Sequence, residues 1–139
     1  MTNLEQKCVA ALAAHEKAMQ AVKAITLRIR EEFALCPVSV EVMQWDARAN
    51  INHLFDDKGR IKTHLWQALN EIACDGGYGE RGLDAGEVVE HLAASECPHC
   101  IEAWELIQQR KDARQQLGIQ RRLIRYYGKR ALESQEVGQ

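Results

Sequence analysis

The chain has 139 residues, a net charge of −2, 46% apolar and 27% charged side chains, which suits one domain with its own core. Two prolines, 6% aromatic residues and many good helix formers favour an all-α fold. No apolar run is long enough to cross a membrane, and the first residues lack the pattern of a signal peptide. We therefore expect a cytoplasmic protein with reduced thiols and no membrane partner.

The first predicted element is a long helix from about Leu4 to Leu35. Its inward positions alternate steps of four and three residues, which is typical of a coiled-coil seam. These positions are Leu4, Cys8, Ala11, His15, Ala18, Val22, Ile25 and Ile29. Several of them are small, so a partner helix can approach closely. The helix ends before Pro37, because the residue preceding a proline disfavours helical backbone.

Two shorter helices are predicted next, at 40–54 and 64–74. Ser39 is the candidate cap of the first and Thr63 of the second, since a hydroxyl oxygen can accept a hydrogen bond from the first turn. Residues 56–59 read Asp-Asp-Lys-Gly, which predicts a turn between the two helices.

A glycine-rich stretch at 75–82 predicts a loop. It lacks the preceding strand and the spacing of a dinucleotide-binding or phosphate-binding loop, so we do not assign it a nucleotide. Asp84 and Glu87 then have the spacing of a capping box, which predicts the third short helix.

The last predicted element is a long helix that begins near Pro98, in a first turn that tolerates proline, and runs to about Leu132. Its inward positions keep the same four-three spacing through Gly118, which favours one continuous helix. These positions are Leu106, Arg110, Ala113, Leu117, Gln120, Ile124, Tyr127 and Ala131. The alternative is a helix-turn-helix with Gly118 in the turn, because a basic half follows that glycine.

The predicted fold is therefore a single all-α domain over 1–139. Its long N-terminal and C-terminal helices pack antiparallel, and the three shorter helices pack at one end, where a metal could tie helix ends together. Residues 133–139 are predicted to form a frayed tail.

The tetrapeptide Cys97-Pro98-His99-Cys100 is the strongest chemical motif. Two cysteines three residues apart can bind one metal ion with little strain, and five cysteines cannot all pair in disulfides. The predicted ligands are Cys74, His91, Cys97 and Cys100. His99 is an alternative ligand. This set suits tetrahedral zinc, although the spacing does not separate zinc from iron.

The alternative to this metal site is that Cys74 is a buried apolar residue and His91 a solvated helix residue. The other two cysteines, Cys8 and Cys36, are interpreted as core residues, because free cysteine is often buried.

The same tetrapeptide is similar to the active site of the strongly oxidising disulfide oxidases in the thioredoxin superfamily. This resemblance implies a nucleophilic Cys97 whose pKa is lowered by a helix N-terminus. It covers four residues only, and that family requires a βαβ scaffold, which is not predicted here. No other catalytic constellation is convincing, so we expect no enzyme and keep a thiol oxidoreductase as the second alternative.

Charge is unevenly distributed along the chain. Residues 1–109 carry ten basic and seventeen acidic side chains, whereas 110–130 carry eight basic side chains and one acidic. The eight are Arg110, Lys111, Arg114, Arg121, Arg122, Arg125, Lys129 and Arg130. Lysine and arginine neutralise phosphates, and the nearby Tyr126 and Tyr127 can stack on bases.

We therefore predict a small zinc-stabilised regulatory protein that binds nucleic acid through 110–130. The first alternative is a protein-interaction module, in which the basic helix docks on an acidic protein or two copies form a homodimer. The basic side chains can also be interpreted without a partner, as a helix face that is only solvated.

Overall fold

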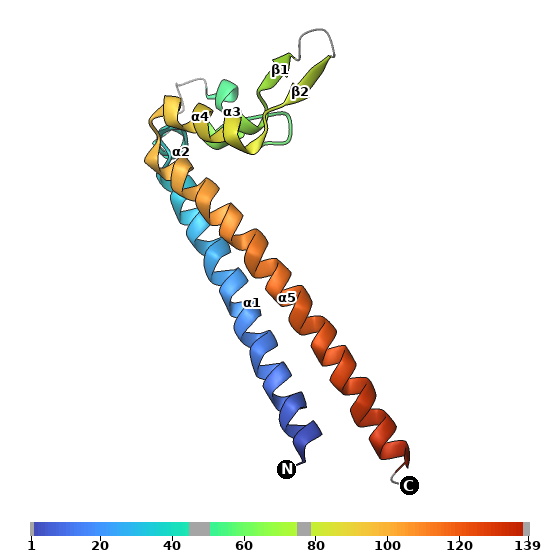
Figure 1. Cartoon of the computed structure of the whole chain (residues 1–139). Helices are drawn as coiled ribbons and strands as arrows, with labels where there is room; N and C mark the ends of the chain where they lie inside the picture. Colours follow the sequence, from blue (N-terminus) through green and yellow to red (C-terminus); the bar gives the residue numbers. More distant parts are fainter. Residues whose placement is uncertain (1, 45–50, 75–78, 138–139) are drawn as a thin grey trace. The chain divides into compact units, whose positions relative to one another are not determined.

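The computed structural model describes residues 2–44, 51–74 and 79–137, except for the side chains of residues 73, 74 and 137. The chain divides into two compact units. We call Met1–Leu27 with Ile107–Gln139 the helical-pair unit, and Arg28–Leu106 the cysteine unit. The two longest helices, α1 (Asn3–Leu35) and α5 (Pro98–Val137), each contribute to both units (Figure 1).

In the helical-pair unit, α1 and α5 run antiparallel, as predicted (Figure 1). Near the N-terminus the Cys8 thiol lies 3.7 Å from the carbonyl oxygen of Tyr127, to which it donates a hydrogen bond. Farther along α1, Arg110 donates from Nη1 to Thr26 Oγ1 over 3.5 Å. These two contacts pair the start of one helix with the end of the other.

The predicted seam is confirmed on both helices. All sixteen inward positions are buried or half-buried, including Ala11 at 6% and Leu117 at 8% exposure. The first helix begins with a capping box, in which Thr2 Oγ1 accepts from the Glu5 amide and the Glu5 carboxylate accepts from the Thr2 amide. It ends at Leu35, before Cys36-Pro37, as expected.

The last helix is continuous through Gly118, so the helix-turn-helix alternative is wrong. A methyl group at Gly118 would meet no atom within 4 Å. We therefore expect Gly118→Ala to raise the free energy of unfolding by about 1 kcal/mol, because glycine is the poorer helix former. Thermal unfolding followed by circular dichroism measures this change. Gly59→Ala is the matched control, and it should destabilise, because Gly59 has a φ of 76°. Destabilisation by Gly118→Ala would contradict a helical backbone at this position.

The cysteine unit contains most of the buried side chains of the described chain. The largest fully buried apolar ones are Leu65, Leu92, Leu106 and Val88. Among the described residues between α1 and α5 lie six shorter elements: α2 (Pro37–Met43), η1 (Asn52–Leu54), α3 (His64–Leu69), β1 (Ile72–Cys74), β2 (Glu80–Gly82) and α4 (Ala85–Ser95). The three short α-helices were predicted, and the all-α class is confirmed apart from the two-stranded ribbon.

The second helix starts earlier than predicted. It begins at Pro37, and Cys36 occupies the N-cap position, whereas Ser39 is buried inside the helix and does not cap it. Proline favours the first helical position because its φ is already helical and its missing N–H is not needed there. Of the predicted helix over 40–54, residues 45–50 lie outside the described residues, and 52–54 form a 3₁₀ turn.

The third helix ends earlier than predicted, at Leu69. Thr63 caps its start as expected, because Thr63 Oγ1 accepts from the Trp66 amide over 3.2 Å. At its end, the carbonyl oxygen of Trp66 accepts from the Asn70 amide over 3.0 Å and also from the Asn70 side chain over 2.8 Å. Residues 72–74 then pair antiparallel with 80–82, so part of the predicted loop forms a strand.

The fourth helix has the predicted capping box. Asp84 Oδ1 accepts from the Glu87 amide over 2.8 Å, and the Glu87 carboxylate accepts from the Asp84 amide over 3.3 Å. Glu96 then adopts a left-handed φ of 56°, which ends α4 and allows α5 to start at Pro98. The last helix continues to Val137, beyond the predicted end near Leu132. No described helix combines the length and apolarity needed to cross a bilayer.

Candidate metal centre

Four side chains converge inside the cysteine unit. They are Cys36, His64, Cys97 and Cys100, and one potential ligand atom of each lies within 4.8 Å of the other three. In a tetrahedral site with bonds of 2.0–2.3 Å, ligand atoms lie about 3.3–3.8 Å apart. The Sγ of Cys36 is 3.4 Å from His64 Nδ1, close to that separation. This cluster could therefore hold a metal ion.

Each member of the cluster lies at the start of a helix. Cys36 is the N-cap of α2, and His64 is the first residue of α3 after the Thr63 cap. Cys97 immediately precedes α5, and Cys100 lies in its first turn. The Cys100 amide donates to the sulfur of Cys97 over 3.5 Å, so the local turn already directs backbone N–H groups toward sulfur. A metal there would tie three helix starts together.

The sulfurs are buried, with Cys36 and Cys100 at 0% exposure and Cys97 at 2%. A hydrogen bond from the Cys100 thiol, opposed by burial and helped by the backbone N–H groups of His64 and Val38, lowers the pKa of Cys36 to about 4. The same interaction with Cys36, together with burial, raises the pKa of Cys100. One thiolate is thus stabilised, and a bound cation would compensate the charge of further thiolates.

Neighbouring polar groups hold the backbone around the cluster. Ser95 Oγ accepts from the Cys97 amide over 3.4 Å and donates to the carbonyl oxygen of Leu92 over 2.6 Å. His99 Nδ1 lies 2.9 Å from a carboxylate oxygen of Glu32 on α1. His99 is therefore engaged outside the cluster, and it is not one of the four candidate ligands.

The structure brings together two of the four ligands predicted from the sequence, Cys97 and Cys100. The predicted ligand His91 lies on α4 outside the cluster, and its Nδ1 is buried with no hydrogen-bond partner among the described atoms. The prediction for Cys74 falls on a side chain outside the described ones, although its backbone forms part of β1.

The sequence interpretation did not include Cys36 and His64 among the candidate ligands. A signal for Cys36 was present, because both prolines of the chain follow a cysteine, in Cys36-Pro37 and Cys97-Pro98. In each case the cysteine lies at a helix start, where backbone N–H groups stabilise a thiolate. For His64 the sequence contains no similar signal of a ligand, apart from its position directly after the predicted helix cap.

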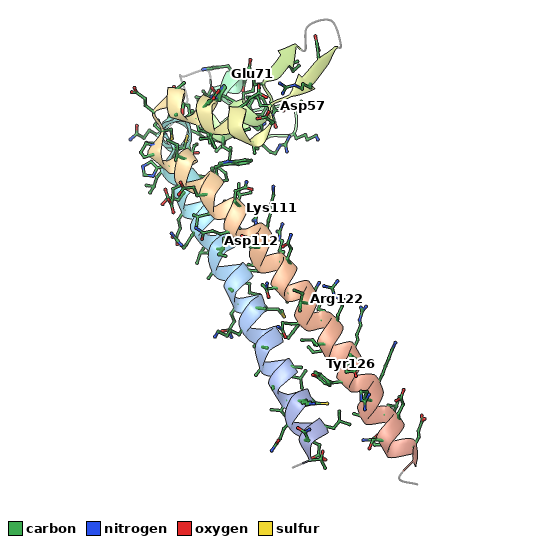
Figure 2. The ribbon with its side chains drawn as sticks, in the orientation of Figure 1. Asp57, Glu71, Lys111, Asp112, Arg122 and Tyr126 are labelled. Atoms are coloured by element: carbon green, nitrogen blue, oxygen red, sulfur yellow. The ribbon has the colours of Figure 1, made fainter. Side chains whose placement is uncertain are left out.

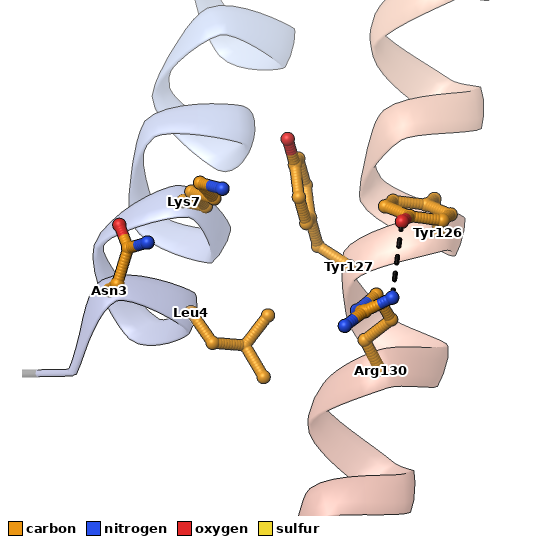
Figure 3. Close-up of a pocket in the computed structure, with 6 residues that line it drawn as sticks. All are labelled: Asn3, Leu4, Lys7, Tyr126, Tyr127 and Arg130. Atoms are coloured by element: carbon orange, nitrogen blue, oxygen red, sulfur yellow. Dashed lines mark hydrogen bonds between the residues drawn. The ribbon is translucent and has the colours of Figure 1, made fainter.

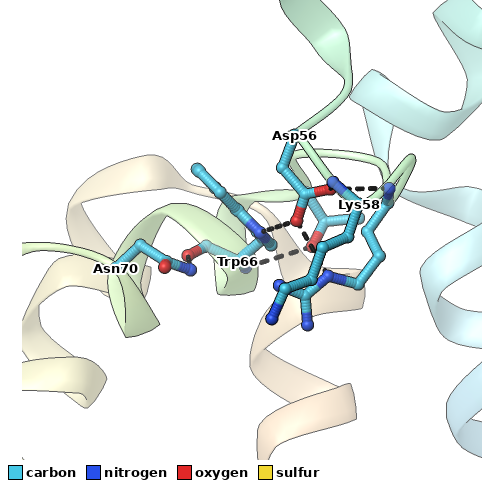
Figure 4. A network of polar contacts seen from close by, with 6 residues as sticks. Asp56, Lys58, Trp66 and Asn70 are labelled. Carbon is cyan, nitrogen blue, oxygen red and sulfur yellow. Dashed lines mark hydrogen bonds and ion pairs between the residues drawn. The ribbon is translucent and has the colours of Figure 1, made fainter.

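A second polar cluster holds the turn that precedes α3 (Figure 4). The Asp56 carboxylate, 4% exposed, accepts from the amides of Lys58 and Arg60 over 2.9 and 2.8 Å. It also accepts from Arg60 Nε over 2.8 Å and from Trp66 Nε1 over 3.0 Å. Burial raises the pKa of Asp56, but these hydrogen bonds outweigh it and lower the pKa to about 2. The network connects the turn to α3, which carries His64.

We expect Asp56→Asn to lower the melting temperature at neutral pH by roughly 5 °C, because a neutral amide cannot accept all four hydrogen bonds. The folded pKa of about 2 lies below the ordinary value of 3.8, so the carboxylate stabilises the fold above pH 3.8. This stabilisation should disappear as the pH falls from 3.8 to 2. The melting difference between wild type and variant, measured by circular dichroism, should shrink over that window. Asp57→Asn, at the exposed neighbouring position, is the control, and equal melting of all three proteins at neutral pH would contradict the role of Asp56.

The eight basic residues predicted to bind nucleic acid all lie on α5, in the helical-pair unit. Seven are exposed, and Arg110 is half-buried. At 100° per residue, those from Arg110 to Lys129 fall within an arc of about 120° and roughly 30 Å of helix. This arc begins at the seam position Arg110 and turns away from the seam, and Arg130 lies outside it. Figure 2 labels two of them, Lys111 and Arg122, with Tyr126.

The two units differ in charge. The helical-pair unit carries eleven basic and five acidic residues, a balance of +6, whereas the cysteine unit carries seven and fifteen, a balance of −8.

Comparisons of the chain with protein-family models, curated proteins and solved structures found no match. Function is therefore inferred from the cysteine–histidine cluster and the basic surface of α5.

Proposed function

We propose that the protein binds nucleic acid through the basic face of α5 and acts as a regulatory protein without catalytic activity. The supporting observation is the row of six exposed lysine and arginine side chains, from Lys111 to Lys129, along one face of a continuous helix. Such a row neutralises successive phosphates, and phosphate contacts supply most sequence-independent affinity. The excess positive charge of the helical-pair unit, +6, also attracts a polyanion at long range.

We also propose that the cluster of Cys36, His64, Cys97 and Cys100 holds a structural zinc ion. Three sulfurs and one imidazole are a ligand set of structural zinc, whereas catalytic zinc keeps one position open for water. The burial of all three cysteines supports a closed site. It also favours ligands over an exposed nucleophile such as the thiol oxidoreductase would need.

The proposed binding is tested by fluorescence anisotropy with labelled nucleic acids of about 20 nucleotides, at salt concentrations from roughly 50 to 200 mM. If six of the exposed cations contact phosphates, a plot of log Kd against the logarithm of the salt concentration should have a slope of about 4–6. Protein purified at low salt should also have a raised absorbance ratio at 260 and 280 nm. Binding that does not depend on salt, or no binding to DNA or RNA, would refute the proposal.

A second candidate function is a protein-interaction module, favoured by apolar side chains on the surface of the helical-pair unit. Val9, Leu12 and Leu132 are 53–58% exposed. Leu12 also lines a hollow of about 170 Å³, together with Cys8, Ile124, Tyr127 and Gly128. Such a surface suits a helix of a second copy. Light scattering that gives a dimer at micromolar concentration, without retained nucleic acid, would favour this candidate.

A further inference from the structure

A cavity of about 430 Å³ lies where the two helices of the helical-pair unit end (Figure 3). It is lined by Asn3, Leu4, Lys7, Tyr126, Tyr127 and Arg130. Its volume is within the range of small-molecule sites. The lining combines two cations from different helices with two tyrosine rings, which suits a ligand that is both aromatic and anionic.

The ring of Tyr126 is oriented by its neighbours and is still accessible. The Arg130 guanidinium lies 5.7 Å from the ring centroid and donates from Nη1 to the Tyr126 hydroxyl over 3.3 Å. Tyr127 meets the ring edge-on, with centroids 5.2 Å apart. Even so, 52% of Tyr126 is exposed, so part of the ring is open to a ligand.

Positive charge surrounds this ring on several sides. Arg122 and Arg130 lie one helical turn before and after Tyr126, each about 6 Å away along the axis of α5. Lys7 contributes a further ammonium group from α1, on the opposite wall of the cavity (Figure 3). A base stacked on Tyr126 would therefore have a cation near the phosphate that precedes it in the strand and another near the phosphate that follows it.

We infer that Tyr126, Arg130 and Lys7 form a subsite for one nucleobase and its phosphate, so that the nucleic acid recognised is single-stranded. This inference rests on the proposed nucleic-acid binding and names the class of substrate. Stacking on an aromatic ring requires an exposed base face, and a duplex offers one only after unstacking, which costs a few kcal/mol. Stacking is also tolerant of sequence, because every base has an aromatic face.

The test uses the zinc-loaded full chain and three labelled probes of about 20 nucleotides: oligothymidylate, an abasic strand with the same sugar-phosphate backbone, and a duplex. Wild type should bind oligothymidylate about tenfold more tightly than either other probe. Tyr126→Ala should weaken oligothymidylate binding about tenfold and abasic binding less than twofold, because only the stacked base is lost. Tyr126→Phe should bind like wild type.

Two further variants keep the test specific. Tyr126→Leu retains apolar bulk and helix propensity but lacks the aromatic face, so it should bind as weakly as Tyr126→Ala. Ile119→Ala changes another exposed apolar side chain of α5 outside the cavity, and it should bind like wild type. Arg130→Ala removes one phosphate contact, so it should lower the slope of log Kd against log salt concentration by about one.

The outcomes separate this inference from the function on which it rests. Equal, salt-dependent binding of the abasic strand and oligothymidylate, unchanged in Tyr126→Ala, would refute the base subsite and leave phosphate binding by α5 intact. Preference for the duplex with no effect of Tyr126→Leu would refute it as well. Failure to bind any of the three probes would refute both proposals.

Discussion

The purified protein is expected to carry about one zinc ion per chain, and Cys100→Ser is expected to lose both the ion and the fold of the cysteine unit. Structural zinc contributes on the order of 10–16 kcal/mol in small zinc domains, which is as large as the whole stability of a typical domain. The three cysteines of the cluster are among the buried side chains of the cysteine unit, so loss of the ion leaves buried sulfurs without a cation. Elemental analysis and circular dichroism measure the two losses.

Paired variants distinguish the cluster in the structure from the ligand set predicted by sequence spacing. His64→Ala and Cys36→Ser should lose zinc, whereas His91→Ala and Cys74→Ser should retain it. Cys8→Ser is the control for a cysteine in the helical-pair unit, and it should also retain zinc. The opposite pattern would assign the ion to the set predicted from the sequence.

A protein without metal would contradict both ligand sets. In that case a free-thiol count before and after denaturation separates the other interpretations. A readily formed disulfide between Cys97 and Cys100, together with activity lost in Cys97→Ser, would support the thiol oxidoreductase. Inert thiols would instead leave three buried cysteines that serve only packing.

Reversing two charges on α5 is expected to weaken nucleic-acid binding about 100-fold in Arg121→Glu with Arg122→Glu, because two attractions become repulsions. Alanine at both positions should weaken binding about tenfold and should lower the slope of log Kd against log salt concentration by about two, because two phosphate contacts are lost. Both side chains are exposed and lie away from the seam, so the melting temperature should not change. Anisotropy titrations at several salt concentrations measure these effects.

The matched control reverses two charges on the other helix of the same unit. Lys17→Glu with Lys23→Glu changes the net charge equally, and both residues are exposed on α1. This variant should bind within about threefold of wild type, because only long-range attraction changes. Equal weakening by both double variants would mean that total charge, and not the face of α5, determines binding.

Local features of the chain were predictable because they depend on residues close in sequence. The four-three spacing identified the seams of both long helices, and it continued through Gly118 without a break. Capping groups such as Thr63 and Asp84 marked helix starts correctly. These signals are hydrogen bonds and side-chain periodicities within one or two helical turns, so no tertiary information is needed to recognise them.

Helix boundaries were predictable where a capping residue marks them and no tertiary contact redirects the backbone nearby. The end of α3 was missed because residues 72–74 leave the helix and pair with 80–82. Good helix formers around Ile72 did not reveal this pairing, which depends on contact between two strands.

The helical architecture, the basic face of α5 and one half of the candidate metal centre could be predicted from local patterns in the chain. Cys97 and Cys100 were recognisable because a single helical turn brings them together. Only the tertiary structure selected Cys36 and His64, since each is separated from the next ligand by about thirty residues. A tetrahedral site is defined by distances in space, and packing of helix starts, not spacing along the chain, decides which distant side chains share it.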